Sequence, residues 1–293
     1  MVLSIIILNW NTKEDTVKCL LSIQEHPSKY ETEVIVVDNA SSDGSREWIS
    51  ERCPWVKIIV NPKNIGFGAG NNRGASAAKG EFILFLNSDT LLTDGALDAL
   101  VEFAKQHPDI GVIGPRLLNF DGSLQYSCRR FPNLAAGFFR NTPLGRLFPH
   151  NPYTRDYLMN DWDHETERDV DWLSGAALMI RRELLITLGG FDERFYMYCE
   201  DVDLCFRAHQ QGWRVTYYPY AKIYHRIGRS SDKAPTRMTW FFHQSMYLFY
   251  KKHYARNTFI LIRPFIIPGL IARASGQLIR YKWRNMRKRH KLK

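Results

Sequence analysis

EFILFLNSDT, at residues 81–90, is the stretch that decides the fold of this chain. Its apolar run at 82–86 is typical of a strand that is buried on both faces of a parallel sheet. The run ends abruptly at Asn87, Ser88 and Asp89, and ligands of open parallel sheets bind just beyond the carboxyl ends of central strands. A carboxylate there is well placed to bind a divalent metal and, through it, a diphosphate. The alternative is a polar turn that only caps the strand.

Strand-like and helix-like segments alternate through the first 115 residues. The strand-like runs cover residues 2–8, 34–37, 56–60, 82–86 and 111–113. Helix candidates lie between them at 13–25, 45–52, 68–78 and 94–107. This order predicts an α/β fold with a mostly parallel, Rossmann-like central sheet flanked by helices.

The rest of the chain is less regular. Residues 115–169 are rich in Asn, Pro, Arg and aromatic residues, which favours long loops. A strand-like run at 170–182, a helix candidate at 200–212 and a strand-like run at 214–218 follow. From residue 239 the chain is aromatic, apolar and basic, and we expect a helical extension.

Charge divides the chain into two parts. The 293 residues carry a formal charge of +10, but no acidic residue follows Asp232, and 233–293 contains 15 Lys and Arg. Subtracting these 15 charges leaves −5 on residues 1–232. We therefore predict a catalytic domain over 1–232 and a basic extension over 233–293. A uniformly basic nucleic-acid binder has a different pattern, so we expect no nucleic-acid partner.

The compartment is predicted from cysteine usage and hydropathy. The five cysteines are scattered, odd in number and without CxxC spacing, which favours reduced thiols in the cytosol. The run at 2–8 has no basic leader and is expected to be a strand rather than a signal peptide. No apolar run reaches the roughly 18–20 residues that span a bilayer.

Polar residues also follow the first two strands. Asn9 and Asn11 come after the first run and Asp38 after the second, so parallel strands would bring them to the same edge as Asp89. Asp38 could accept hydrogen bonds from a nucleobase or a ribose, or serve only a turn, and Asp43 is expected to be an N-cap residue.

The loop NPKNIGFGAGNNRG, at 61–74, is rich in glycine and opens a helix. Its glycines let the backbone approach a phosphate, and a helix N-terminus favours anions. The spacing differs from the dinucleotide fingerprint, because Gly74 comes one residue too late for G-x-G-x-x-G and the loop follows a third strand.

Three carboxylates open the helix candidate at 200–212. Glu200, Asp201 and Asp203 follow the aromatic run FYMYC, at 195–199. These carboxylates could take part in catalysis. The alternative is that they only stabilise the helix, because acidic side chains at a helix N-terminus interact favourably with its dipole.

Two further candidates come from single aromatic residues. Trp172, before the flexible Ser174-Gly175 turn, offers either an indole face for a sugar ring or a core residue. His225 is either structural or, beside a metal-ready Asp89, a further metal ligand.

Together these segments are far more specific than any one of them. The series SIIILNWN, VIVVDNASSDGS, NIGFGAGNNRG, FILFLNSDT, WLSGAALMIRR, GGFDERFYMYCEDVDLCFR and YHRIGRSS resembles the inverting family-2 glycosyltransferases. Within them it is most similar to the bacterial rhamnosyltransferase-like branch that builds cell-surface polysaccharides. The resemblance covers about residues 3–231, with every motif in family order.

The resemblance implies a glycosyltransferase A-type domain that binds a nucleoside-diphosphate sugar and Mg²⁺ or Mn²⁺. It makes Asp89 and His225 metal ligands and Asp201, paired with Glu200, the catalytic base. Asn87 departs from the family, where many members have Asp, and we expect it to contact sugar or ribose. The implied donor-binding residues are Asn9, Asn11, Asp38, Asn64, Gly66, Arg73, Asn87 and Ser88. The implied acceptor or sugar contacts are Trp172, Ser174 and Gly175.

The expected reaction is an inverting transfer in which Asp201 takes the proton from an acceptor hydroxyl. By branch resemblance the favoured donor is dTDP-rhamnose, followed by UDP-sugars, and the acceptor is a glycan or a polyprenyl-linked glycan. Two alternatives stay open: a catalytically silent sugar-nucleotide-binding or scaffold protein, and a dinucleotide-dependent oxidoreductase.

The tail suggests a membrane surface. Residues 259–271 are apolar but broken by proline, and 280–293 holds eight Lys and Arg with Tyr281 and Trp283 among them. Apolar residues beside a polybasic run suit an interfacial anchor on an anionic leaflet. We therefore expect a cytoplasmic protein, peripheral on the inner face of the cell membrane; the alternative is a packing segment with a solvated basic end.

Overall fold

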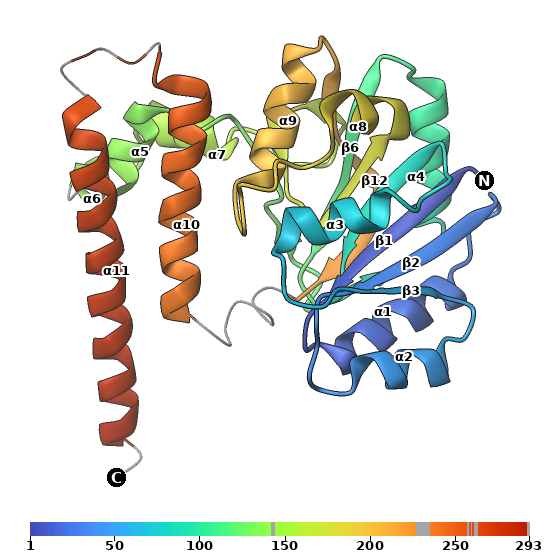
Figure 1. The fold of residues 1–293 in the computed structure, drawn as a ribbon. Helices are drawn as coiled ribbons and strands as arrows, with labels where there is room; N and C mark the ends of the chain where they lie inside the picture. Colours follow the sequence, from blue (N-terminus) through green and yellow to red (C-terminus); the bar gives the residue numbers. More distant parts are fainter. Residues whose placement is uncertain (142–143, 227–234, 257, 259, 261–262, 292–293) are drawn as a thin grey trace.

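The computed structural model describes residues 1–293 except 142–143, 227–234, 257, 259, 261–262 and 292–293. Its main body is one twisted sheet with helices on both faces, and two long C-terminal helices stand beside it (Figure 1). The predicted boundary near residue 232 lies outside the described residues.

The central sheet is mixed but mostly parallel, as predicted. In spatial order its strands are β3 (Lys57–Val60), β2 (Thr32–Asp38), β1 (Leu3–Asn9), β4 (Phe82–Asn87), β11 (Ala177–Arg181), β6 (Ile110–Leu118), β12 (Arg214–His225) and β5 (Thr90–Leu92). The strands from β3 to β4 are mutually parallel, as are β6 and β12, whereas β11 is antiparallel to both β4 and β6. The short strands are β7 (Leu124–Gln125) beside β6, β9 (Arg168–Asp169) beside β12, and the separate pair β8 (Cys128–Arg129) and β10 (Trp172–Leu173).

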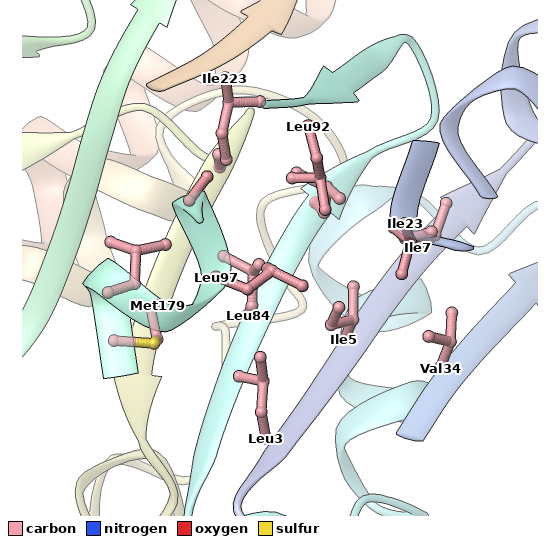
Figure 2. Packing of buried hydrophobic residues seen from close by; sticks show 14 of the residues in the cluster. Leu3, Ile5, Ile7, Ile23, Val34, Leu84, Leu92, Leu97, Met179 and Ile223 are labelled. Atoms are coloured by element: carbon pink, nitrogen blue, oxygen red, sulfur yellow. The ribbon is translucent and has the colours of Figure 1, made fainter. Parts of the chain in front are cut away.

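Helices cover both faces of this sheet. One face packs against α1 (Lys13–Glu25), α2 (Ser45–Arg52) and α4 (Ala96–Gln106), and the other against α3 (Phe67–Ala75), α8 (Arg182–Leu188) and α9 (Glu200–Gln210). In β1, Ile5 and Ile7 face the first layer together with Leu84 (Figure 2), while Ile6 faces the second layer with Phe85. The central strands therefore contain unbroken apolar runs, because alternate side chains enter two different cores.

The first half follows the expected pattern closely. Helices α1 and α2 have the predicted bounds, whereas α3 begins at Phe67 and ends at Ala75, before the predicted 78. The run predicted as a strand at 111–113 is longer, because β6 continues to Leu118 alongside β12.

The second half differs more. The region 115–169, expected to be long loops, contains the end of β6, the strands β7 to β9, and the helices α5 (Leu134–Asn141), α6 (Leu144–Leu147) and α7 (Pro152–Leu158). The run at 170–182 is divided into β10 and β11, and the strand predicted at 214–218 extends to His225. β7 pairs locally with the end of β6, whereas β8, β9 and β10 are short strands that form by pairing with distant segments.

The C-terminal extension is helical, as expected. It consists of α10 (Pro235–Phe249), the π-helix η2 (Tyr250–Tyr254) and α11 (Arg263–Lys291). Helix α10 lies between α11 and the main body (Figure 1). Within the described residues, no helix has both the length and the apolarity needed to cross a membrane.

Candidate active site

The carboxyl ends of β1 and β2 are joined by a buried hydrogen-bond bracket. Asn9 pairs with Asp38 in the register of the two strands, and Asn9 Nδ2 donates to Asp38 Oδ1 at 2.8 Å. Asn9 Oδ1 accepts from the hydroxyls of Thr12 and Thr16 at 2.9 and 2.8 Å, and Asp38 Oδ2 accepts from Ser41 N at 3.1 Å. The two predicted residues therefore meet, and the bracket fixes the orientation of the Asp38 carboxylate.

The glycine-rich loop is bonded to the end of β2 through Asn39 and to the aromatic run through Tyr196. Asn39 Nδ2 donates to Asn64 Oδ1 at 3.0 Å and to Gly66 O at 3.1 Å. Asn64 Oδ1 also accepts from the Tyr196 hydroxyl at 3.0 Å. Gly66 has a φ of +94°, and a Cβ there would lie 2.5 Å from Tyr196 O. Gly66 is thus required because the backbones of two loops approach each other closely at this position. The prediction from the sequence was different, namely that Gly66 lets the backbone approach a phosphate.

Asp89 and His225 lie together, as predicted for a metal site. His225 Nε2 is 3.3 Å from Asp89 Oδ1, and Asn87 Nδ2 lies 3.4 Å from the same nitrogen. His225 Nδ1 is 2.6 Å from Gln125 Oε1; with that oxygen as acceptor Nδ1 is the donor, and Nε2 is the ring nitrogen that faces Asp89. A carboxylate and an imidazole nitrogen presented together suit a divalent cation. Among the described residues there is no cluster of three His, Cys, Asp or Glu that could hold one.

Two links connect these groups into one site. The Ser88 and Thr12 hydroxyls lie 3.0 Å apart, so the end of β4 is joined to the Asn9 bracket. On the other side, Asn87 N donates to Ala176 O at 2.9 Å, next to the turn that contacts Asp201. The polar residues predicted on separate segments therefore line one edge of the sheet.

Asp201, near the N-terminus of α9, is held by two backbone donors. Gly175 N donates to Asp201 Oδ2 at 2.9 Å, and Val202 N donates to Oδ1 at 2.8 Å. Burial raises the pKa of Asp201, while these N–H groups act in the opposite direction. The flexible turn predicted to contact a sugar or an acceptor thus contacts Asp201 directly.

Glu200 is buried beside Asp201, and its Oε2 has no hydrogen-bond partner. Burial, and then the charge of Asp201, raise the pKa of Glu200 well above its usual range. Glu200 thus has the more strongly raised pKa of the pair, whereas Asp201 accepts the backbone hydrogen bonds that favour its charged form.

The sequence of this body matches the family model described as glycosyl transferase family 2 over residues 4–188. The chain belongs to that family. It is a glycosyltransferase, and the dinucleotide oxidoreductase and the silent scaffold considered above are set aside.

Curated relatives of this glycosyltransferase include sugar transferases. It is 33% identical over 267 residues to the N-acetylglucosaminyl-diphospho-decaprenol L-rhamnosyltransferase of Mycobacterium tuberculosis, covering 87% of this chain and 86% of the relative. It is 30% identical over 165 residues to the rhamnosyltransferase WbbL of Escherichia coli, covering 53% of this chain and 58% of WbbL. These findings support the resemblance to the rhamnosyltransferase-like branch.

Solved structures show the same fold. The Staphylococcus aureus TarS fragment 1–349 in complex with UDP-GlcNAc has a TM-score of 0.57 at 21% identity, covering 84% of this chain and 65% of that chain. GalNAc-T7 with UDP, GalNAc and Mn²⁺ also has a TM-score of 0.57, at 17% identity, covering 77% of this chain and 44% of that chain. At these identities the likeness establishes the glycosyltransferase A-type fold.

Other predicted site residues of the glycosyltransferase are placed less centrally. Arg73 is exposed in the last turn of α3. Trp172 Nε1 donates to Arg130 O at 2.9 Å, and its ring packs against two core clusters. Ser174 Oγ accepts from Ala176 N at 3.3 Å, and Asn11 Oδ1 accepts from Ser42 N at 2.7 Å. Local packing therefore accounts for these contacts, and the ligand roles of all four stay predictions.

Two residues that organise the site were missed. Asn39 follows Asp38 at the end of β2, and a buried polar residue just after a buried strand was the available signal. Gln125 orients His225 from 100 residues earlier in the chain, and nothing in the local sequence around Gln125 indicates this contact.

Proposed function

We propose that this enzyme transfers a sugar, with rhamnose favoured, from a nucleoside-diphosphate sugar to a hydroxyl of a glycan or polyprenyl-linked glycan in cell-surface polysaccharide synthesis. The names of the relatives support this, because the mycobacterial one is a decaprenol-linked L-rhamnosyltransferase and a Myxococcus xanthus relative is an O-antigen biosynthesis protein. The favoured donor is dTDP-rhamnose, followed by a UDP-sugar. The observation that carries the proposal is Asp201, held by two backbone N–H groups beside the strand ends.

In this proposal Asp201 is the base of an inverting reaction. Its carboxylate accepts the proton of the acceptor hydroxyl, whose oxygen attacks the anomeric carbon from the face opposite the diphosphate. The two N–H bonds orient the carboxylate, and the burial of Glu200, whose Oε2 has no hydrogen-bond partner, disfavours a second negative charge beside it. No covalent enzyme intermediate is required.

Asp89 and His225 would hold a divalent cation, Mg²⁺ or Mn²⁺, together with the donor diphosphate. The Gln125 contact supports this assignment, because a fixed imidazole tautomer leaves Nε2 free as a ligand. When bound, such a cation neutralises charge that develops on the leaving diphosphate. Asn87, whose Nδ2 lies 3.4 Å from His225 Nε2, would contact the sugar or the ribose beside this group.

The nucleotide would lie along the strand ends of β1 and β2. Asp38, fixed by Asn9, faces that edge, and the Asn39-bonded loop of Asn64 and Gly66 would border it. The N–H groups of Ile65, Gly66 and Phe67 already donate to Asn39 Oδ1, Asn64 Oδ1 and Tyr196 O, so the predicted phosphate contact of this loop would not use them.

The basic extension would place the enzyme on an anionic membrane surface, on the cytoplasmic face. Its charge supports this, since 233–293 contains 15 Lys and Arg and no acidic residue. Large apolar side chains on α11 are also exposed: Phe265, Ile267, Ile271, Ile279 and Trp283. Exposed apolar groups beside basic ones bind the interface of anionic bilayers. A polyprenyl-linked acceptor would lie in the same membrane.

Thermal unfolding against a panel of nucleoside diphosphates and their sugars, with and without Mn²⁺, tests the proposal. A ligand at about 100 times its dissociation constant should add roughly 2.7 kcal/mol to the free energy of unfolding. We expect metal-dependent stabilisation by dTDP and dTDP-rhamnose. Stabilisation by UDP-sugars alone would overturn the donor assignment, and stabilisation that is the same without metal would overturn the metal assignment.

A further inference from the structure

The C-terminal helix α10 packs directly on the aromatic run that precedes the catalytic pair. Ser245 Oγ donates to Met197 O at 2.8 Å. The ring of Phe241 lies 4.6 Å from that of Tyr196, between centroids. Tyr196 also contacts the glycine-rich loop, because Phe67 N donates to Tyr196 O at 2.8 Å. The run at 195–199 is therefore held between α3 on one side and α10 on the other.

The backbone of this run is unusual just before the catalytic pair. Tyr198 and Cys199 have φ values of +69° and +61°, which side-chain-bearing residues rarely adopt. Such conformations persist only where the surroundings hold them. Tyr198 contacts the ring of Phe242 of α10, with centroids 5.5 Å apart. Helix α10 thus contributes to holding the turn from which α9 begins at Glu200.

The π-helix η2 provides charges for a buried carboxylate of α9. Asp203 has a fully buried side chain and accepts from Lys252 Nζ at 2.6 Å, His253 Nε2 at 2.7 Å and Arg207 Nε at 2.7 Å. Lys252 Nζ also reaches Asp192 Oδ2 at 2.7 Å. Burial tends to raise the pKa of Asp203, but hydrogen bonds from His253 and Lys252 and the charge of Arg207 outweigh it, and the pKa lies below its usual range.

We propose that Lys252 and His253 are positioning residues for glycosyl transfer, acting through Asp203 to set the first turn of α9 and thereby aim Asp201. This rests on the proposed role of Asp201 as the base. Asp201 is held from the sheet side by Gly175 N, and Asp203, two residues later, is held from the extension by η2. The geometry of the base therefore depends on contacts from both parts of the chain.

Two observations favour a functional role over simple packing. Single-turn π-helices are rare and occur frequently at functional sites, because the wider turn redirects side chains. In η2 that turn brings two adjacent residues, Lys252 and His253, onto one carboxylate oxygen, Asp203 Oδ1. A buried carboxylate that loses partners is unfavourable, so we expect the first turn of α9 to shift when Lys252 or His253 is removed, even though Arg207 still bonds to Asp203 Oδ2.

The test compares full-length variants at position 252 in steady-state transfer assays. Lys252→Met should lower kcat at least about tenfold while leaving the donor KM and the nucleotide Kd within about twofold, because a small misplacement of a catalytic group slows the chemical step. Lys252→Arg should recover most of kcat. The matched control is Lys251→Met, which removes the same charge from an exposed neighbour and should behave as wild type.

His253→Phe keeps the test decisive if Lys252→Met does not fold. It keeps a ring against Phe206 and Phe249 but removes the hydrogen bond to Asp203 Oδ1, and we expect kcat to fall several-fold without a change in donor KM. Unchanged kcat in Lys252→Met or in His253→Phe would overturn the proposal, and so would a loss of kcat that only follows the unfolded fraction in thermal melts. Asp201→Asn serves as a separate arm: if it retains turnover, the base assignment fails irrespective of how the Lys252 variants behave.

Discussion

At the residue scale, Asp201 and Glu200 are adjacent carboxylates with different surroundings. Asp201 accepts two backbone N–H bonds, whereas Glu200 is buried with an oxygen that has no hydrogen-bond partner. Environment rather than residue type therefore distinguishes the proposed base, Asp201, from its neighbour Glu200.

Replacing the proposed base should remove the chemistry and keep binding. Asp201→Asn preserves the shape and one acceptor oxygen but cannot take a proton, so we expect kcat to fall about 10²- to 10⁴-fold. Nucleotide affinity, measured by calorimetry, should stay unchanged. Glu183→Gln, an exposed carboxylate of α8, is the control and should have wild-type kcat. Substantial turnover by Asp201→Asn would refute the assignment.

Replacing Glu200 should change the dependence of stability on pH. Because its pKa in the folded state lies above the ordinary 4.5, the proton it retains stabilises the fold fully below pH 4.5, and this contribution is lost as pH rises through the raised value. The side chain in Glu200→Gln has a similar shape and is neutral at every pH, so the variant does not lose this contribution to stability. In denaturant titrations, the free energy of unfolding of the variant should therefore increase relative to that of the wild type as pH rises above 4.5. Parallel stability curves would contradict the raised pKa.

At the element scale, the site depends on two loops that approach each other closely. The glycine-rich loop contacts the aromatic run at Gly66, where a Cβ would lie 2.5 Å from Tyr196 O. Asn39 joins the same loop to the end of β2. A disturbance at this contact would be transmitted from the predicted nucleotide edge to the segment before α9.

Gly66→Ala tests this contact. The positive φ and the close approach together should lower the free energy of unfolding by about 1–3 kcal/mol, measured by denaturant titration, and should reduce transfer activity. Gly122→Ala is a matched control, since Gly122 has a φ of +82° but an added Cβ there would meet nothing within 4 Å. An equal loss in both variants would show that the backbone conformation alone matters, against the close-approach argument.

At the scale of the whole molecule, an acidic body carries a basic, largely helical extension. Helix α10 contacts the main body through Ser245 and Met197, whereas α11 lies on the outer side of α10 (Figure 1). The extension thus has an inner part against the catalytic body and an outer part with exposed apolar residues.

The outer part should bind anionic vesicles. In flotation assays we expect the full chain to float with vesicles containing anionic lipid, and to do so less at high salt because screening weakens the attraction. Changing Phe265 and Ile271 together to Gln should weaken flotation, since both side chains are exposed on α11. Trp55→Gln, at an exposed aromatic residue of the main body, is the control. Equal flotation of all three proteins would count against membrane docking by α11.

The sequence by itself determined the α/β class, the bounds of α1 and α2, and the residues at the strand ends. These features have local causes: two-sided burial makes the run at 82–86 wholly apolar, and polar residues such as Asn9, Asp38 and Asp89 follow where strands leave the core. The family resemblance came from the same segments, because their order and spacing are properties of the chain alone.

Only the tertiary structure decided how these residues act on one another. Gln125 contacts His225 across 100 residues, Gly175 N orients Asp201, and Lys252 and His253 reach Asp203 from the extension. The strands β8 to β10 are likewise too short for local propensity to specify them, and they form where distant partners pair with them. Such contacts have no local signal, since their energy comes from burial and pairing that exist only after the chain has folded.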